Sequence, residues 1–132
     1  MPDQPTVSLG MPVYNGAIFL AATLDALLAQ TYRDFELIIA DNASTDDTAA
    51  IVRDYAARDG RIRYQRNETN IGGSANYNLT FELARGRYFK WAAHDDLCAP
   101  TFLERCVAAL EGDPDVVLAY TQARAIDSAG NV

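Results

Sequence analysis

The run FELIIAD, residues 35–41, is short, nearly all apolar and ends in an acid. This pattern suits a strand of a parallel sheet that is covered on both faces, because such a strand has no solvent-facing side to alternate with polar residues. Parallel neighbours must be joined by a crossover connection, which is usually a helix. The run therefore predicts an α/β fold.

The rest of the chain alternates in the same way. Segments with apolar residues at helical spacing, such as the leucines that follow Gly16, separate apolar or alternating runs. Strands that alternate with helices predict a mostly parallel sheet with helices on both faces, a Rossmann-like three-layer sandwich. The other strands are expected at 6–14, 61–66, 87–93 and 115–120, with 61–66 near an edge.

Local signals mark the expected ends of the helices. Gly16 precedes the first helical segment, the STDD sequence at 44–47 resembles a capping box before the second, and Pro100 suits the first turn of the fourth. We expect Gly86 to end the third helix and Gly112 to follow the fourth.

Composition excludes several classes of protein. A net charge of -7 leaves no broad basic surface for nucleic acid. Cys98 and Cys106 are too few for a disulfide scaffold or a zinc site, and we expect reduced core thiols. No apolar run reaches the roughly 18 residues of a membrane span, and the N-terminus lacks the features of a signal peptide. We therefore expect a cytoplasmic protein, and we interpret the end at SAGNV as a cut within a longer one.

Polar residues follow three of the predicted strands: PVYNG at 12–16, ADNAS at 40–44 and AHDDL at 93–97. In an open parallel sheet, ligands bind beyond the carboxyl ends of the strands. These three segments are therefore expected to meet at one crevice.

The first two segments and the loop at 70–73 allow two interpretations each. The 12–16 loop has neither GxGxxG nor GxxxxGK[ST], which disfavours a dehydrogenase or a P-loop protein, and Tyr14 either stacks on a base or packs in an ordinary turn. Asp41 either accepts a hydrogen bond from a base or ribose, or shapes the turn together with Asn42. The two glycines of the 70–73 loop either let backbone N–H groups approach a phosphate or belong to a plain loop.

His94, Asp95 and Asp96 give the sharpest signal. Carboxylate oxygens suit Mg²⁺ or Mn²⁺, and a divalent ion offsets the repulsion between adjacent acids. Alternatively, one aspartate caps the helix near Pro100 and the other is solvated. His94 is a ligand, a hydrogen-bond donor to a sugar, or a packing residue of the loop.

Taken together, these motifs resemble family 2 glycosyltransferases with the GT-A fold. The matching elements are the strand that ends in PVYN, the block LLAQTYRDFELIIADNASTDDT, the NETNIG loop, Asn78 and Gly86, and Asp95–Asp96 as the DxD-type pair. The resemblance covers nearly all 132 residues. It implies that residues 1–132 are the nucleotide-sugar-binding part of a GT-A domain whose acceptor-binding part is absent.

The resemblance also assigns roles by position. The metal, Mn²⁺ or Mg²⁺, falls to Asp96 with Asp95 beside it, and Asp41 lies at the base. His94 stands where the family often has an acid, and Tyr77 where it often has an arginine. The residues expected to bind the nucleotide are Pro12, Tyr14, Asn15, Asp41, Gly72 and Asp95.

The implied activity is inverting, metal-dependent transfer of a sugar from a nucleotide-diphosphate donor, with UDP the expected nucleotide. The acceptor is a glycan, a lipid-linked molecule or a protein, in cell envelope polysaccharide synthesis, in the cytoplasm or at the inner face of the membrane. The general base is expected beyond residue 132, so the isolated chain is expected to be inactive.

Two other functions are compatible with the residues. The chain is alternatively a nucleotide-binding module or an inactive paralogue that does not transfer a sugar. The absence of a downstream carboxylate from the full gene product would indicate this alternative. A sugar-1-phosphate nucleotidyltransferase is less favoured, because PVYNGA lacks the Gly-rich, Arg-containing loop of such enzymes. A truncated sheet exposes apolar surface, so a homodimer that covers it is also expected.

Overall fold

The computed structural model describes residues 4–132, and residues 1–3 of the N-terminal segment considered above lie outside it. The strands form one parallel sheet in the order β3-β2-β1-β4. The elements are β1 (Val7–Val13), α1 (Ala17–Leu28), β2 (Phe35–Asp41), α2 (Thr48–Arg58), β3 (Ile62–Arg66), α3 (Gly73–Glu82), β4 (Tyr88–Trp91) and α4 (Phe102–Gly112).

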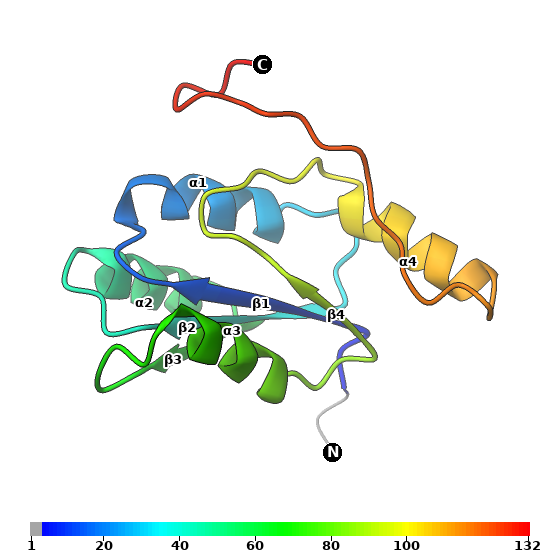
Figure 1. The fold of residues 1–132 in the computed structure, drawn as a ribbon. Helices are drawn as coiled ribbons and strands as arrows, with labels where there is room; N and C mark the ends of the chain where they lie inside the picture. The colour runs from blue at the N-terminus through cyan, green and yellow to red at the C-terminus, as the bar shows by residue number, and fades with distance from the viewer. Residues whose placement is uncertain (1–3) are drawn as a thin grey trace.

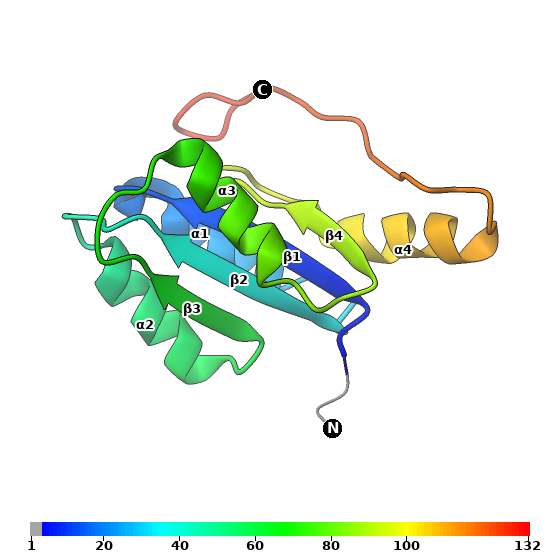
Figure 2. The same ribbon diagram turned by 60° about the horizontal axis from the view of Figure 1, so that its bottom comes forward.

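Helices cover both faces of the sheet, which confirms the predicted fold class. In Figure 1 α1 lies above the strands and α3 below them, and Figure 2 shows α3 crossing β1 and β2. Every residue of β1 and β2 is buried, as expected for central parallel strands, whereas β3 is partly exposed at an edge. The apolar side of α1, which includes Leu20, Leu24 and Leu27, is buried in the core.

The fifth predicted strand is wrong. Residues 113–132 leave α4 as an extended segment without strand structure (Figure 1), and Val117, Leu118 and Tyr120 are 91%, 72% and 84% exposed. An apolar, β-branched run becomes a strand only where a neighbouring strand supplies backbone partners. Within residues 4–132, no backbone hydrogen bond joins this segment to β4.

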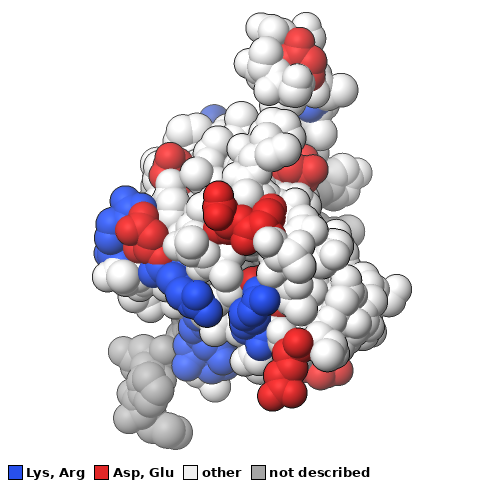
Figure 3. Space-filling model, turned by 90° about the vertical axis from the view of Figure 1, so that its left-hand side faces the viewer, with Lys and Arg blue, Asp and Glu red and all other residues white. Residues whose placement is uncertain are grey.

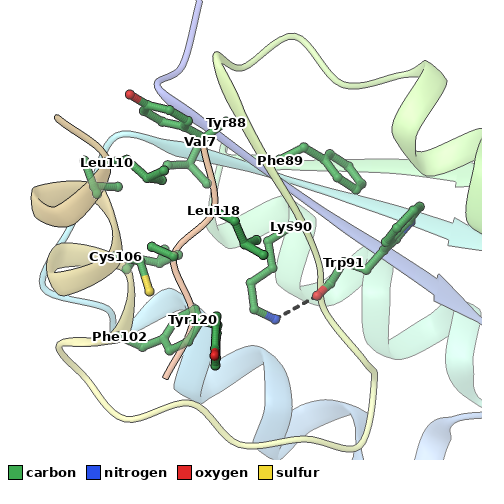
Figure 4. A pocket seen from close by; sticks show the side chains of 13 residues that line it. Val7, Tyr88, Phe89, Lys90, Trp91, Phe102, Cys106, Leu110, Leu118 and Tyr120 are labelled. Atoms are coloured by element: carbon green, nitrogen blue, oxygen red, sulfur yellow. Dashed lines mark hydrogen bonds between the residues drawn. The ribbon is translucent and has the colours of Figure 1, made fainter. Parts of the chain in front are cut away.

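The segment instead lies across an apolar cavity. The cavity has a volume of about 380 Å³ and is lined by residues of β4 and α4. Figure 4 shows the side chains of Leu118 and Tyr120 beside it. The Lys90 ammonium donates to the Trp91 carbonyl over 2.7 Å. Because the Ala92 N–H bonds to β1, the Trp91 carbonyl points to the open edge of β4, where Lys90 occupies it. Charged side chains on edge strands discourage pairing of this kind.

Several predicted helix boundaries are also corrected. No capping box forms at 44–47, because the N-cap of α2 is Asp47, which makes no side-chain capping bond. The Ser44 hydroxyl accepts from Asn15 N. The third helix ends at Glu82, before Gly86, and a Cβ on Gly86 would lie 2.7 Å from Ser8 N. Gly86 therefore permits close packing on β1.

The last helix differs slightly from its predicted bounds, and both cysteines are free thiols, as expected. The helix α4 begins at Phe102, after the turn that contains Pro100, and includes Gly112 as its last residue. Cys98 and Cys106 are free and partly buried, and burial raises the pKa of both thiols. No helix among residues 4–132 is long and apolar enough to cross a membrane.

Candidate functional site

The strand order reverses at β1, since β2 and β3 lie on one side of it and β4 on the other. In an open parallel sheet such a switch point creates a crevice beyond the carboxyl ends of the strands. The loops after β1, β2 and β4 begin at this end of the sheet, as predicted. Figure 3 looks onto it and shows acidic and basic side chains gathered close together on that face.

Asn15 joins the loop after β1 to the loop after β2. Its backbone is left-handed, with φ of 50°, a conformation in which asparagine is enriched. Its N–H donates to the Ser44 hydroxyl over 2.9 Å, and its Oδ1 accepts from Thr45 N over 2.8 Å. The shape of this edge is therefore fixed before any ligand binds. Tyr14 is 50% exposed and available for stacking, whereas Pro12 is buried within β1.

Asp46 caps two helices at once, a role that the sequence did not reveal. Its Oδ2 accepts from Ala17 N over 3.1 Å, and its Oδ1 accepts from Thr48 N over 3.0 Å. These residues begin α1 and α2, whose N-terminal ends carry partial positive charge. Burial raises the pKa of Asp46, but the hydrogen bonds from Thr48 and Ala17 outweigh it and leave the pKa below its ordinary value.

The Asp41 carboxylate is buried and accepts hydrogen bonds from other residues of the chain. It has no exposed surface, its Oδ1 accepts from Ser44 N, and its Oδ2 accepts from Tyr64 and Arg66 over 2.7 and 2.8 Å. Burial raises the pKa of Asp41, but these donors outweigh it and leave the pKa below its ordinary value. In this arrangement Asp41 shapes the turn, and its contact with a base stays a prediction.

Arg66 is the second residue that the sequence did not single out. Its side chain is 37% exposed, and it also donates to the Ser44 carbonyl over 3.1 Å. It comes from the end of β3, so it links the ends of β3 and β2.

A network of asparagines holds the loop at 70–73. The Asn42 Oδ1 accepts from Asn67 over 3.1 Å and from Ile71 N over 2.9 Å. The Asn70 Oδ1 accepts from Asn42 and from Gly72 N, both over 2.9 Å. The N–H groups of Ile71 and Gly72 are therefore taken by side chains, and their approach to a phosphate stays a prediction.

The adjacent acids after β4 have no hydrogen-bond partner among residues 4–132. Asp95 and Asp96 are exposed, and among the contacts of the described part of the chain neither carboxylate accepts a hydrogen bond. The N-cap of α4 is Thr101, so neither aspartate caps that helix. Thus the alternative of a helix cap is not supported.

His94 packs in the loop. A Cβ on Gly16 would lie 2.6 Å from His94 Cδ2, so the imidazole lies directly against the turn after β1. This contact brings the loop after β4 onto the loop after β1 and places Asp95 and Asp96 beside the switch point.

The side chains that could ligate a metal match a hard divalent ion only in part. No group of three or more His, Cys, Asp or Glu residues within 4–132 is arranged to hold a metal. Two exposed carboxylates nevertheless match Mg²⁺ or Mn²⁺, which commonly bind one or two protein carboxylates and take their other oxygens from phosphates and water.

The sequence is similar to several proteins from bacteria and archaea. A sequence profile described as "Glycosyl transferase family 2" matches residues 8–131. An uncharacterised glycosyltransferase of Methanocaldococcus jannaschii is 33% identical over 98% of this chain and 46% of its own length. The chondroitin synthase of Escherichia coli is 34% identical over 97% of this chain and 18% of its own length.

Solved structures show the same fold. S. aureus TarS 1–349 in complex with UDP-GlcNAc superposes with a TM-score of 0.76 and 26% identity, over 81% of this chain and 31% of that one. The mannosyltransferase PcManGT from Pyrobaculum calidifontis, in complex with GDP-Man and Mn²⁺, gives a TM-score of 0.76 and 28% identity, over 87% and 34%. The chain thus spans less than half the length of each of these proteins.

Proposed function

Because this chain belongs to glycosyl transferase family 2 and has the GT-A type of fold, we propose that it is the donor-binding part of an inverting, metal-dependent transferase that uses a UDP-linked sugar. The observation that carries the proposal is the Asp95–Asp96 pair. Both carboxylates are exposed beside the switch point, where the half-exposed Tyr14 also lies.

In this proposal the nucleoside stacks on Tyr14, and Asn15 keeps the loop after β1 in its binding shape. Asp95 accepts hydrogen bonds from the ribose or the donor sugar. Asp96, with Asp95, would hold Mn²⁺ or Mg²⁺, and a bound ion there would neutralise charge on the diphosphate leaving group. Asp41 and Arg66 do not contact the nucleotide in this proposal. They hydrogen-bond to the backbone of Ser44 and so hold the turn after β2 in place.

Transfer itself needs more than this site. The acceptor hydroxyl must lose a proton to a general base, and the relatives are more than twice as long as the matched region. We assign the base and the acceptor site, for a glycan, a lipid-linked molecule or a protein, to such a further region. The 132 residues then bind the donor without transferring the sugar.

Calorimetry tests donor binding directly. UDP and GDP are each titrated into the protein with Mn²⁺, and ribose 5-phosphate serves as the matched ligand that lacks a base and a diphosphate. We expect saturable binding of UDP, weaker binding of GDP and none of ribose 5-phosphate. An absence of any nucleotide binding at millimolar concentration would contradict the proposed function.

A further inference from the structure

The loop after β1 contains Asn15–Gly16, the one Asn-Gly pair of the sequence. Asn15 is exposed and Gly16 is buried. In a flexible chain an asparagine before glycine deamidates readily, because glycine has no side chain to hinder the attack of its backbone nitrogen on the asparagine side chain. The turn that joins β1 to α1 therefore contains a chemically labile pair.

The shape of the loop requires both residues of this pair. Asn15 has a left-handed backbone, with φ of 50°, which few residues other than glycine and asparagine adopt at low cost. A Cβ on Gly16 would lie 2.6 Å from His94 Cδ2 and 2.7 Å from Val13 Cγ2, which is too close for any other residue without rearrangement. Neither residue can therefore be exchanged without disturbing the loop.

Both reacting groups are held by the segment after β2. The Gly16 N–H donates to Thr48 Oγ1 over 3.0 Å, and Thr48, the first residue of α2, is fully buried. The Asn15 Oδ1 accepts from Thr45 N over 2.8 Å and from Asp46 N over 3.3 Å. The bonds to Oδ1 hold the side chain in place, but they also polarise its carbonyl carbon toward attack. The restraint on the reaction thus falls mainly to the Gly16–Thr48 bond, which holds the nucleophile.

We propose that Asn15–Gly16 is a latent deamidation site that the fold keeps closed, and that Thr48 is the residue that closes it. When the loop opens, the Gly16 nitrogen bonds to the Asn15 side-chain carbonyl carbon. The bond from this carbon to the amide nitrogen breaks, and ammonia leaves with the proton of Gly16. Water then opens the resulting succinimide ring at either carbonyl, which gives aspartate or isoaspartate.

The two products affect the loop differently. Aspartate keeps the side-chain oxygens that accept from Thr45 N and Asp46 N. Isoaspartate adds a carbon to the main chain between β1 and α1, so the N–H groups of residues 15 and 16 can no longer meet Ser44 and Thr48 as they do now. We expect the isoaspartate form to lose UDP binding, a consequence that rests on the proposed function. The modification itself does not depend on that function.

Peptide mass mapping measures the reaction without any ligand. The tryptic peptide 1–33 contains no asparagine besides Asn15, so its gain in mass reports this site alone. The peptide 67–85, which has four asparagines and no Asn-Gly pair, is the internal reference. The wild type is incubated at mildly alkaline pH, folded and in guanidinium chloride. We expect peptide 1–33 to deamidate more than about tenfold more slowly in the folded protein, because the loop must open first.

Variants of Thr48 test the assignment of the restraint. Thr48→Val removes the acceptor at nearly constant shape and should speed deamidation of the folded protein about two- to tenfold, the effect of one neutral hydrogen bond. Thr48→Ser keeps the hydroxyl and should stay as slow as the wild type. Glu36→Gln is the matched control, because it removes a buried charge from the start of β2, far from Asn15 along the strand. It should leave the rate unchanged as long as the protein is folded.

The outcomes are distinct from those for donor binding. Equal deamidation of peptide 1–33 in the folded and unfolded wild type would overturn the protection by the fold, and this comparison needs no variant. Equal rates for folded Thr48→Val and the wild type, or an equal acceleration in Glu36→Gln, would overturn the role of Thr48. A protein that binds neither UDP nor GDP would refute the proposed function and leave this inference standing, since the mass measurement requires no nucleotide.

Discussion

The Tyr64 hydroxyl donates a hydrogen bond of 2.7 Å to the Asp41 carboxylate, which joins the ends of β3 and β2. A hydrogen bond to a buried charge contributes more to stability than one between neutral groups. Tyr64→Phe should therefore lower the free energy of unfolding by about 1.5–3 kcal/mol, measured by urea denaturation. Tyr14→Phe is the matched control, and an equal loss in the two variants would mean that the Asp41 contact contributes nothing.

Asp46 gives a second prediction. Asp46→Ala removes an acceptor from the first N–H groups of α1 and α2, so we expect a loss of about 1–2 kcal/mol, in the range measured for helix caps. Asp47 is the N-cap residue of α2 but makes no side-chain capping bond. Asp47→Ala should cost less than about 0.5 kcal/mol, and the reverse order of the two variants would show that the cap is misassigned.

The Glu36 carboxylate should make the stability of the fold depend on pH in the acid range. It is buried in β2 and accepts from Ser8, Arg63 and Arg85. Burial raises its pKa, but these donors outweigh it, so the folded pKa lies below the ordinary value of 4.5. A depressed folded pKa contributes stability above the unfolded value, and this stability is lost as the pH falls through the folded pKa. Asp41, whose pKa is lowered from 3.8, acts in the same direction.

Urea denaturation between pH 7 and pH 3 measures this loss of stability in acid. The wild type should lose stability steadily below about pH 4.5. Glu36→Gln should be less stable at pH 7, because a neutral amide replaces the partner of two arginines, and should depend less steeply on pH in the acid range. Identical slopes for the two proteins would exclude Glu36 as a source of acid sensitivity.

The central strands and the position of the crevice could be predicted from the sequence. The run 35–41 is nearly all apolar, which suits a strand covered on both faces, and β2 has this environment. Parallel strands place their carboxyl ends at one edge, so PVYNG, ADNAS and AHDDL meet there for topological reasons.

The partners of the polar side chains could not be predicted in this way. Asp41 is paired with Tyr64 and Arg66 of the next strand, and Asn42 with Asn67 and Asn70, all 23–28 residues away. An aspartate at a strand end has the same local sequence whether it faces a ligand or a neighbouring arginine. The failed strand at 115–120 has a similar cause, because strand formation depends on a neighbour and not only on composition.

The most direct test concerns Asp96. UDP affinity is measured by calorimetry for the wild type, Asp96→Asn and the control Asp54→Asn, each with Mn²⁺ and with a chelator. The wild type and Asp54→Asn should bind UDP more tightly with Mn²⁺. Asp96→Asn, which loses the negative charge but keeps its shape, should bind UDP equally in both conditions, at the affinity of the metal-free wild type. Equal UDP affinity of the wild type with Mn²⁺ and with chelator would contradict a metal-dependent donor site.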